Sequence, residues 1–253
     1  MNIKMYWVGA STIVFDVDGV LKFAFDPCLV KEDSIVSFNS FDSKRVISPK
    51  YDTTTFKDID MWFFTHGHLD HIDNEGKLVV DKNSYIFTCK NVKLILDDPK
   101  YKNKIILKWY ESYSTNFKGY EIKITAIPAY HGSNFIMRTA TGKVNGYLIE
   151  LMKNDMIKTI YITSDTVYHK NIIQKIKDVN IDYLVANLGQ VMSSKSGGPI
   201  TMSVKMLNQF CKDLNIKRVI TIHFNDFSHY ETQEIELING GYEVIERGKW
   251  LEV

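Results

Sequence analysis

The most constraining feature of this sequence is a short run of side chains that can bind metal, Thr65-His66-Gly67-His68-Leu69-Asp70-His71. Three of the chain's seven histidines fall within six positions here. The apolar and aromatic residues 59–64 come directly before them and are typical of a buried strand. A strand that ends in a tight turn at Gly67 can aim His66 and His68 to one side, and Asp70 and His71 to the other. A polar surface loop that is rich in histidine by chance is the weaker interpretation, so the sequence predicts a loop that feeds two neighbouring metal ions.

Three further residues with metal-binding side chains each follow an apolar segment. They are His131 after residues 124–130, Asp165 after 159–164, and His223 after 219–222. Taken singly, each has a structural explanation: the two histidines would cap strands, and Asp165 would be the N-cap of a following helix. Taken together with the histidine loop, they favour a shared metal site, because a rigid scaffold presents chemistry at strand ends.

The order of these residues resembles that of a known superfamily. A His-x-His-x-Asp-His motif, a single His, a single Asp and a last His, each after a strand, resemble the metallo-β-lactamase superfamily, and the resemblance runs nearly end to end. The opening segment, from Trp7-Val8-Gly9-Ala10-Ser11 to Asp26-Pro27, is similar to the first hairpins and the buried Asp of that fold. The resemblance implies an α/β (α+β) fold, a four-layer αββα sandwich, with a two-metal site.

The same resemblance implies a role for each candidate residue. His66, His68 and His131 would hold one metal ion, and Asp70, His71 and His223 the second. Asp165 would bridge the two ions, and Asp26 would hydrogen-bond the histidine loop. Such nitrogen and oxygen ligands suit two divalent ions, with zinc favoured, and manganese or iron also fit.

Within the superfamily, the sequence is similar to the group of ascorbate-6-phosphate lactonase-like hydrolases. The residues that support this placement are Asn187-Leu188-Gly189, Pro199-Ile200-Thr201-Met202 and Ile222-His223-Phe224. One departure is Ser164-Asp165, where relatives often have Gly-Asp, and Ser is small enough for the turn.

The predicted reaction is hydrolysis by a binuclear, metal-dependent enzyme of the lactonase, esterase or phosphodiesterase type. A metal-bridging hydroxide would attack an ester, lactone or phosphoester bond of a small metabolite. Asp70 would orient the hydroxide, and His169 or His229 would donate a proton or contact the substrate, although an ordinary exposed histidine is an alternative for each. Lys195 could bind an anionic substrate, or it could be a solvated loop lysine.

Two other functions remain open at this point, and a third is disfavoured. A phosphodiesterase or nuclease-like enzyme of the same fold would need a basic groove, which the net charge of +1 does not suggest. A non-catalytic metal-binding protein of the same fold would show missing ligands, whereas all seven positions are filled. Residues 15–21, Phe-Asp-Val-Asp-Gly-Val-Leu, resemble the nucleophile motif of haloacid-dehalogenase-type phosphatases, but the following residues alternate like the return strand of a hairpin.

Composition sets the remaining expectations. With 253 residues, 45% hydrophobic and 24% charged, we expect a single metallo-hydrolase domain over residues 1–253. Three separated cysteines without a CxxC pair, and no signal peptide or membrane span, indicate a cytoplasmic protein. We expect a small-molecule substrate, no membrane partner and no nucleic acid, and aromatic residues in 109–113 and at Phe38 and Phe41 leave a homo-oligomer open.

The chain pattern predicts strands first and then mixed strands and helices. Strands are expected at 3–8, 12–17, 20–25, 59–64, 84–88, 105–109, 120–128, 146–151, 158–163, 183–186 and 219–222. Helices are expected at 91–97, 171–179, 201–214 and 232–238, with another ending near Val80. Residues 28–51 read as a long loop, and 242–245 with 249–251 as a closing hairpin.

Overall fold

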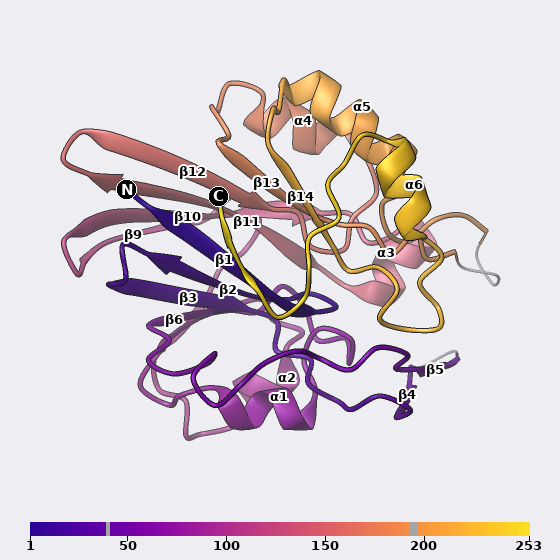
Figure 1. Cartoon of the computed structure of the whole chain (residues 1–253), viewed down its shortest axis with the longest axis horizontal. Helices are drawn as coiled ribbons and strands as arrows, with labels where there is room; N and C mark the ends of the chain where they lie inside the picture. The colour runs from indigo at the N-terminus through magenta and orange to yellow at the C-terminus, as the bar shows by residue number, and fades with distance from the viewer. Residues whose placement is uncertain (39–40, 193–196) are drawn as a thin grey trace. The chain divides into compact units, whose positions relative to one another are not determined.

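The computed structural model describes residues 1–38, 41–192 and 197–253. It divides the chain into two compact units. The first unit comprises Met1–Ile106, Asn225–His229 and Ile245–Val253, and the second comprises Leu107–Phe224 and Tyr230–Val244. Each unit is built on its own sheet, which Figure 1 traces in colour along the chain.

The sheet of the first unit has the strand order β15-β1-β2-β3-β6-β7-β8. Its amino-terminal part is antiparallel, and β3, β6, β7 and β8 then follow in parallel. Asp18, Gly19 and Val20 join β2 to β3, and the positive φ angles of Asp18 and Gly19, 55° and 68°, suit a tight turn between two twisted strands. The strands are β1 (Ile3–Gly9), β2 (Thr12–Val17), β3 (Leu21–Phe25), β6 (Met61–Phe63), β7 (Tyr85–Thr88), β8 (Lys104–Ile106) and β15 (Trp250–Glu252).

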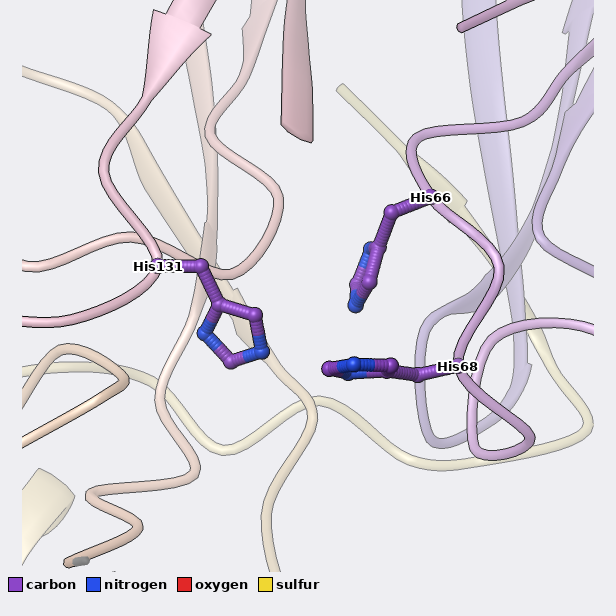
Figure 2. A group of neighbouring side chains, drawn as sticks. All are labelled: His66, His68 and His131. Carbon is purple, nitrogen blue, oxygen red and sulfur yellow. The ribbon is translucent and has the colours of Figure 1, made fainter. Parts of the chain in front are cut away.

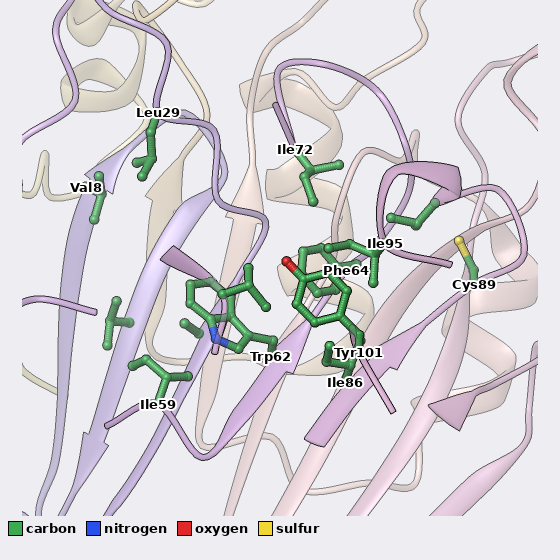
Figure 3. Close-up of a cluster of buried hydrophobic side chains, with 14 of the residues drawn as sticks. Val8, Leu29, Ile59, Trp62, Phe64, Ile72, Ile86, Cys89, Ile95 and Tyr101 are labelled. Atoms are coloured by element: carbon green, nitrogen blue, oxygen red, sulfur yellow. The ribbon is translucent and has the colours of Figure 1, made fainter. Parts of the chain in front are cut away.

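The two faces of this sheet carry different buried side chains, because successive residues of a strand point to opposite faces. One face bears Trp62 and Phe64, which pack with Ile72 and Ile95 beside the short helices α1 (Asn74–Val79) and α2 (Lys93–Leu96) (Figure 3). Stacked phenylalanine rings cross neighbouring strands on the alternate positions, with centroid distances of 4.7–4.9 Å, in the pairs Phe15–Phe23, Phe25–Phe63 and Phe63–Phe87. Both faces are thus apolar, which explains why residues 61–64 form an unbroken apolar run.

Residues 28–51 contain a small antiparallel hairpin, β4 (Ile35–Ser37) and β5 (Asp42–Lys44), which the sequence pattern had placed in a loop. Its register depends on the carboxy-terminal segment: Arg45 forms a β-bridge with Phe227, and Ser228 N donates to the carbonyl of Lys44 (2.9 Å). The buried guanidinium of Arg45 also lies 3.3 Å from the Asp226 carboxylate. These partners lie about 180 residues apart, so no local pattern could reveal them.

The sheet of the second unit has the order β14-β13-β12-β11-β10-β9. Strands β9 to β12 form an antiparallel meander, and β13 and β14 continue it in parallel. Phe210 of helix α5 stacks on Tyr161 of β12, which seats the helix on this sheet (Figure 1). The elements are β9 (Ser112–Phe117), β10 (Tyr120–Ala129), α3 (Phe135–Thr141), β11 (Val144–Lys153), β12 (Met156–Ile162), α4 (Lys170–Ile176), β13 (Tyr183–Asn187), α5 (Val204–Leu214), β14 (Val219–Ile222) and α6 (Glu234–Asn239).

Several sequence expectations need correction. Residues 242–245 form no strand, and β15 pairs with β1 instead of closing a carboxy-terminal hairpin. Strand β8 ends at Ile106, short of residue 109, and β9 and α3 were not expected because their residues are mostly polar or small. The β2–β3 hairpin confirms that residues 15–21 belong to an antiparallel turn. Within the described part of the chain, no helix is long and apolar enough to cross a membrane.

Candidate metal centre

A buried carboxylate at the end of β3 holds the histidine loop. Asp26 accepts hydrogen bonds from the Thr65 backbone N–H (2.8 Å) and the Thr65 hydroxyl (2.6 Å). A third contact joins its Oδ2 to His71 Nδ1 (2.8 Å), and all three residues are buried. Because the carboxylate accepts a hydrogen bond from Nδ1–H, the His71 tautomer carries its lone pair on Nε2, as a metal ligand requires. The Asp26 role that the resemblance implied is the one that the structure shows.

The loop itself is shaped by close backbone approach. A Cβ on Gly67 would lie only 2.5 Å from the Asn91 carbonyl oxygen, so only glycine fits there. The His66 ring lies 4.5 Å from that of His68 and 4.0 Å from that of His71, measured between centroids. Figure 2 shows His66 and His68 on this loop, with their rings turned to the same side.

Two thiols support the loop backbone. Cys89 Sγ lies 3.2 Å from the Thr65 carbonyl, and Cys28 Sγ lies 3.4 Å from the Leu69 carbonyl. Burial raises the pKa of Cys89 to about 12 and raises that of Cys28 well above its ordinary value. Both therefore stay protonated and act as weak donors to the loop rather than as thiolate ligands.

The last candidate of the first unit, His229, lies against the histidine loop. Its Nε2 is 3.5 Å from Asp70 Oδ2, and its Nδ1 is 2.6 Å from the hydroxyl of buried Ser43. The ring of Phe227 packs beside it at 5.7 Å. The structure therefore brings His229 together with Asp70, as the predicted catalytic role requires.

In the second unit, the three single candidates stand at the ends of neighbouring strands. His131 follows β10, Asp165 follows β12, and His223 follows β14. His131 Nδ1 donates to the Ile200 carbonyl (2.8 Å), so its Nε2 also carries the lone pair. This Nε2 lies 3.8 Å from Asp165 Oδ2, and His223 Nε2 lies 3.6 Å from Asp165 Oδ1. Asp165 thus lies between His131 and His223.

Hydrogen bonds and an unusual backbone fix these three ligands. Asn187 Nδ2 donates to Asp165 Oδ1 (3.0 Å), and the Tyr230 hydroxyl lies 2.8 Å from His223 Nε2. Ser164 and His223 have left-handed φ angles of 56° and 65°. Such angles cost free energy in residues other than glycine and concentrate at functional sites. The left-handed φ of residue 164 explains why glycine suits this turn.

His169 has a different environment from the other candidates. It is the N-cap of α4, where its ring nitrogen accepts from Asn171 N (3.2 Å), so Asp165 is not the cap. Its ring stacks on Tyr130, with centroids 3.8 Å apart. Burial, followed by the charge of Arg138, lowers its pKa from the ordinary 6.5. The other candidate outside the ligand set, Lys195, lies outside the described residues.

The chemistry of the donors fits metal ions. The described residues include two groups suited to a cation, one all-imidazole and one with two carboxylates: His66, His68 and His131 (Figure 2), and Asp70, His71, Asp165 and His223. Neutral imidazole and carboxylate are the ligands of divalent zinc, manganese and iron. Histidines with Nδ1 bonded to a carboxylate or a carbonyl are in the state that metal binding needs.

Sequence reasoning missed the residues that support these ligands. Ser43, Thr65, Asn187 and Tyr230 all contact a candidate ligand or its partner. Only Thr65 and Asn187 stood at positions that a sequence pattern indicates: Thr65 directly follows an apolar strand, and Asn187 ends one. Ser43 and Tyr230 lie in polar segments where no periodicity distinguishes them.

Fold and site together define a metal-dependent hydrolase of the metallo-β-lactamase fold. Residues 25–224 match the family model of the beta-lactamase superfamily domain, so the chain belongs to that family. It is 25% identical over 228 residues to the UPF0173 protein YddR of Bacillus subtilis, covering 86% of this chain and 84% of that one. A UPF0173 metal-dependent hydrolase of Pyrococcus abyssi is 23% identical over 226 residues, covering 88% and 85%.

Solved structures show the same fold. An isothiocyanate hydrolase from Delia radicum gut bacteria superposes with a TM-score of 0.80 at 22% identity, over 98% of each chain. A possible metal-dependent hydrolase from Veillonella parvula gives a TM-score of 0.81 at 17% identity, over 100% of this chain and 98% of that one. The fold class expected from the sequence is therefore confirmed.

Proposed function

We propose that this protein is a binuclear metal-dependent hydrolase that cleaves an ester, lactone or phosphoester bond in a small molecule. The observation that carries the proposal is the buried contact between Asp26 and His71, which fixes an imidazole in the form that ligates metal. A purely structural histidine loop would not need a buried carboxylate devoted to one ring nitrogen.

We assign the ligands as the motif resemblance implies. The three imidazoles His66, His68 and His131 would hold one ion. Asp70, His71 and His223 would hold the second, and Asp165 would contribute to both. The proximity of Asp165 to His131 and His223 supports this shared role. Zinc is the favoured ion, with manganese or iron as alternatives.

When bound, the ions would supply a hydroxide nucleophile at neutral pH and would draw electrons from the scissile bond. The chain's own residues would orient the reactants and move protons. Asp70 positions the nucleophile, and its contact with His229 gives a route for a proton towards the leaving group. Ser43 holds the His229 ring in place through Nδ1. His169 remains a proposed substrate contact, supported by its partial exposure at the start of α4.

The finer class that we propose is a lactonase or esterase, on the strength of the segments around Asn187, Ile200 and His223. Asn187 and Ile200 now have defined roles, since each hydrogen-bonds a ligand of the second unit. We propose a cytoplasmic location because Cys28, Cys89 and Cys211 are all free thiols. An anionic substrate and a homo-oligomer stay open.

The proposal is tested by metal removal and an activity panel. Chelated and desalted protein should be inactive on a panel of carboxylic esters, lactones and phosphodiesters, and zinc, manganese or iron(II) should restore turnover. Asp165→Asn preserves the shape of the bridging residue and should lose at least about 100-fold in activity. Asp178→Asn, at an exposed position of the same unit, is the matched control and should match the wild type. Full activity after metal removal would contradict the proposal.

A further inference from the structure

A pair of phenylalanine rings stands beside the histidines of the first unit. Phe38 directly follows β4, Phe41 directly precedes β5, and the two rings stack on each other, with centroids 4.9 Å apart and planes 15° apart. Phe38 contacts the His68 ring edge-on at 6.2 Å. Both phenylalanines also lie 5.2 Å from the His229 ring. The His229 ring contacts both phenylalanines and also Phe227. We call these four side chains, Phe38, Phe41, Phe227 and His229, the aromatic wall.

The wall is anchored rather than loosely attached. Phe38 N donates to the Phe41 carbonyl (2.8 Å), which closes the hairpin. Behind it, Ser43 is bonded to His229, and Lys44 N donates to the Ser228 hydroxyl (3.0 Å). The rings are therefore held in place relative to His68 and His229. A fixed apolar surface can select a ligand because it loses little conformational entropy on binding.

The wall nevertheless leaves apolar surface exposed. Phe41 is 39% exposed and Phe38 is half-buried, whereas nine of the chain's twelve other phenylalanines are buried. Exposed apolar surface beside polar, metal-binding side chains is typical of ligand sites, where a few polar groups orient a ligand that apolar side chains cover. An apolar group of a ligand would gain free energy by covering these rings.

The charges nearby disfavour an anionic group on the wall. The nearest lysine of the hairpin, Lys44, is paired with Asp33 at 2.6 Å. Asp42 at the start of β5 and Glu32 before β4 are exposed acids. The described residues of the hairpin therefore offer a phosphate only a lysine that is already paired with a carboxylate.

We propose that the aromatic wall is a specificity subsite that binds the apolar chain of a neutral carboxylic ester or lactone. Phe38 and Phe41 are its specificity-determining residues, and the chain to be bound is aliphatic. This inference rests on the proposed hydrolase function, but it concerns the substrate class and not the metal chemistry. It restricts the bond that is cleaved to an ester or a lactone and excludes a phosphoester.

The first test varies only the acyl chain. With metal-loaded protein and 4-nitrophenyl acetate, butyrate and hexanoate, kcat/KM should rise about tenfold from acetate to hexanoate. In Phe41→Ala and in the Phe38→Ala/Phe41→Ala double variant, this ratio should fall to about two or below, because the longer acyl chain loses the apolar surface it would cover. Phe41→Leu should keep most of the preference. Phe135→Ala, which removes an exposed ring from the second unit, is the matched control and should leave the ratio unchanged.

The second test measures binding without turnover. Titration calorimetry should show hexanoate binding the metal-loaded wild type about tenfold more tightly than acetate, and Phe41→Ala should abolish the difference. Equal or absent binding of the two carboxylates, or a chain-length ratio that survives both alanine substitutions, would overturn the wall proposal. If no ester or lactone is hydrolysed but hexanoate binding behaves as expected, the proposed reaction fails and the subsite stands.

Discussion

The two units present their candidate ligands in different ways. The first unit carries four ligands on one seven-residue loop, and a buried carboxylate, two thiols and Ser11 hold that loop. The second unit carries three ligands on three separate strand ends, where a backbone carbonyl, an amide and a tyrosine hold them. Charged support in one unit thus contrasts with neutral support in the other.

This difference indicates where each half of the site is vulnerable. The loop depends on a single side chain, Asp26, whose loss would release Thr65 and His71 together. The strand ends depend on the sheet itself, since His131 is oriented by the Ile200 carbonyl, which no substitution can delete. We therefore expect large single-residue effects in the first unit and smaller ones in the second.

The largest expected effect is that of Asp26→Ala. The substitution removes an acceptor of three buried hydrogen bonds and leaves Thr65 and His71 without it, so the free energy of unfolding should fall by about 3 kcal/mol. Urea denaturation of metal-free protein measures this change. Asp58→Asn, an exposed aspartate of the same unit with a left-handed φ of 58°, is the control. If the free energy of unfolding falls by less than about 0.5 kcal/mol in Asp26→Ala, the expected contrast between the two units would be contradicted.

A smaller effect of opposite sign is expected for Ser164→Gly. Glycine tolerates the left-handed φ of 56° that serine adopts at a cost, and the buried serine hydroxyl has no hydrogen-bond partner among the described residues. The free energy of unfolding should rise by about 0.5–1 kcal/mol in the same urea assay. Ser164→Ala keeps the Cβ and should show no such gain. A destabilised glycine variant would mean that the strand-end backbone of the second unit is not strained.

The smallest expected effect is on how the stability of the protein changes as the pH falls. The environment of His169 lowers its folded pKa below 6.5, mainly through burial, so the unfolded chain takes up a proton first as the pH falls. Stability from this group is complete above pH 6.5 and declines below it. His169→Asn keeps an N-cap acceptor without a titrating ring, so its urea midpoint should fall less than that of the wild type between pH 7 and pH 5.5. If the urea midpoints of the wild type and of His169→Asn fall by the same amount between pH 7 and pH 5.5, the effect assigned to the His169 ring would be contradicted.

The sequence predicted the parts of the fold that are encoded locally. Periodicity located most strands, and the spacing of His66, His68, Asp70 and His71 located the loop, because these neighbours share one turn. It also ranked His131, Asp165 and His223 as candidates by their place after apolar strands. The resemblance to a known family supplied the fold class and the buried Asp26.

The remaining features depend on long-range pairing. The β4–β5 hairpin is held by residues 226–228, and β15 pairs with β1 at the opposite end of the sequence. Ser43 and His229 are 186 positions apart, and their contact follows from that pairing. The positive φ of Ser164 arises from the turn between strand and loop. A serine in the sequence does not indicate such an angle. Such features appear only once the sheet order is known.

The central claim, that seven side chains hold two metal ions, is tested most directly by metal stoichiometry. Wild-type protein would be incubated with zinc, desalted and measured by plasma mass spectrometry, beside Asp165→Asn and the Asp178→Asn control. We predict about two equivalents for the wild type and the control, and about one or fewer for Asp165→Asn. Less than about 0.2 equivalents in folded wild-type protein, after loading with zinc, manganese or iron(II), would contradict the account.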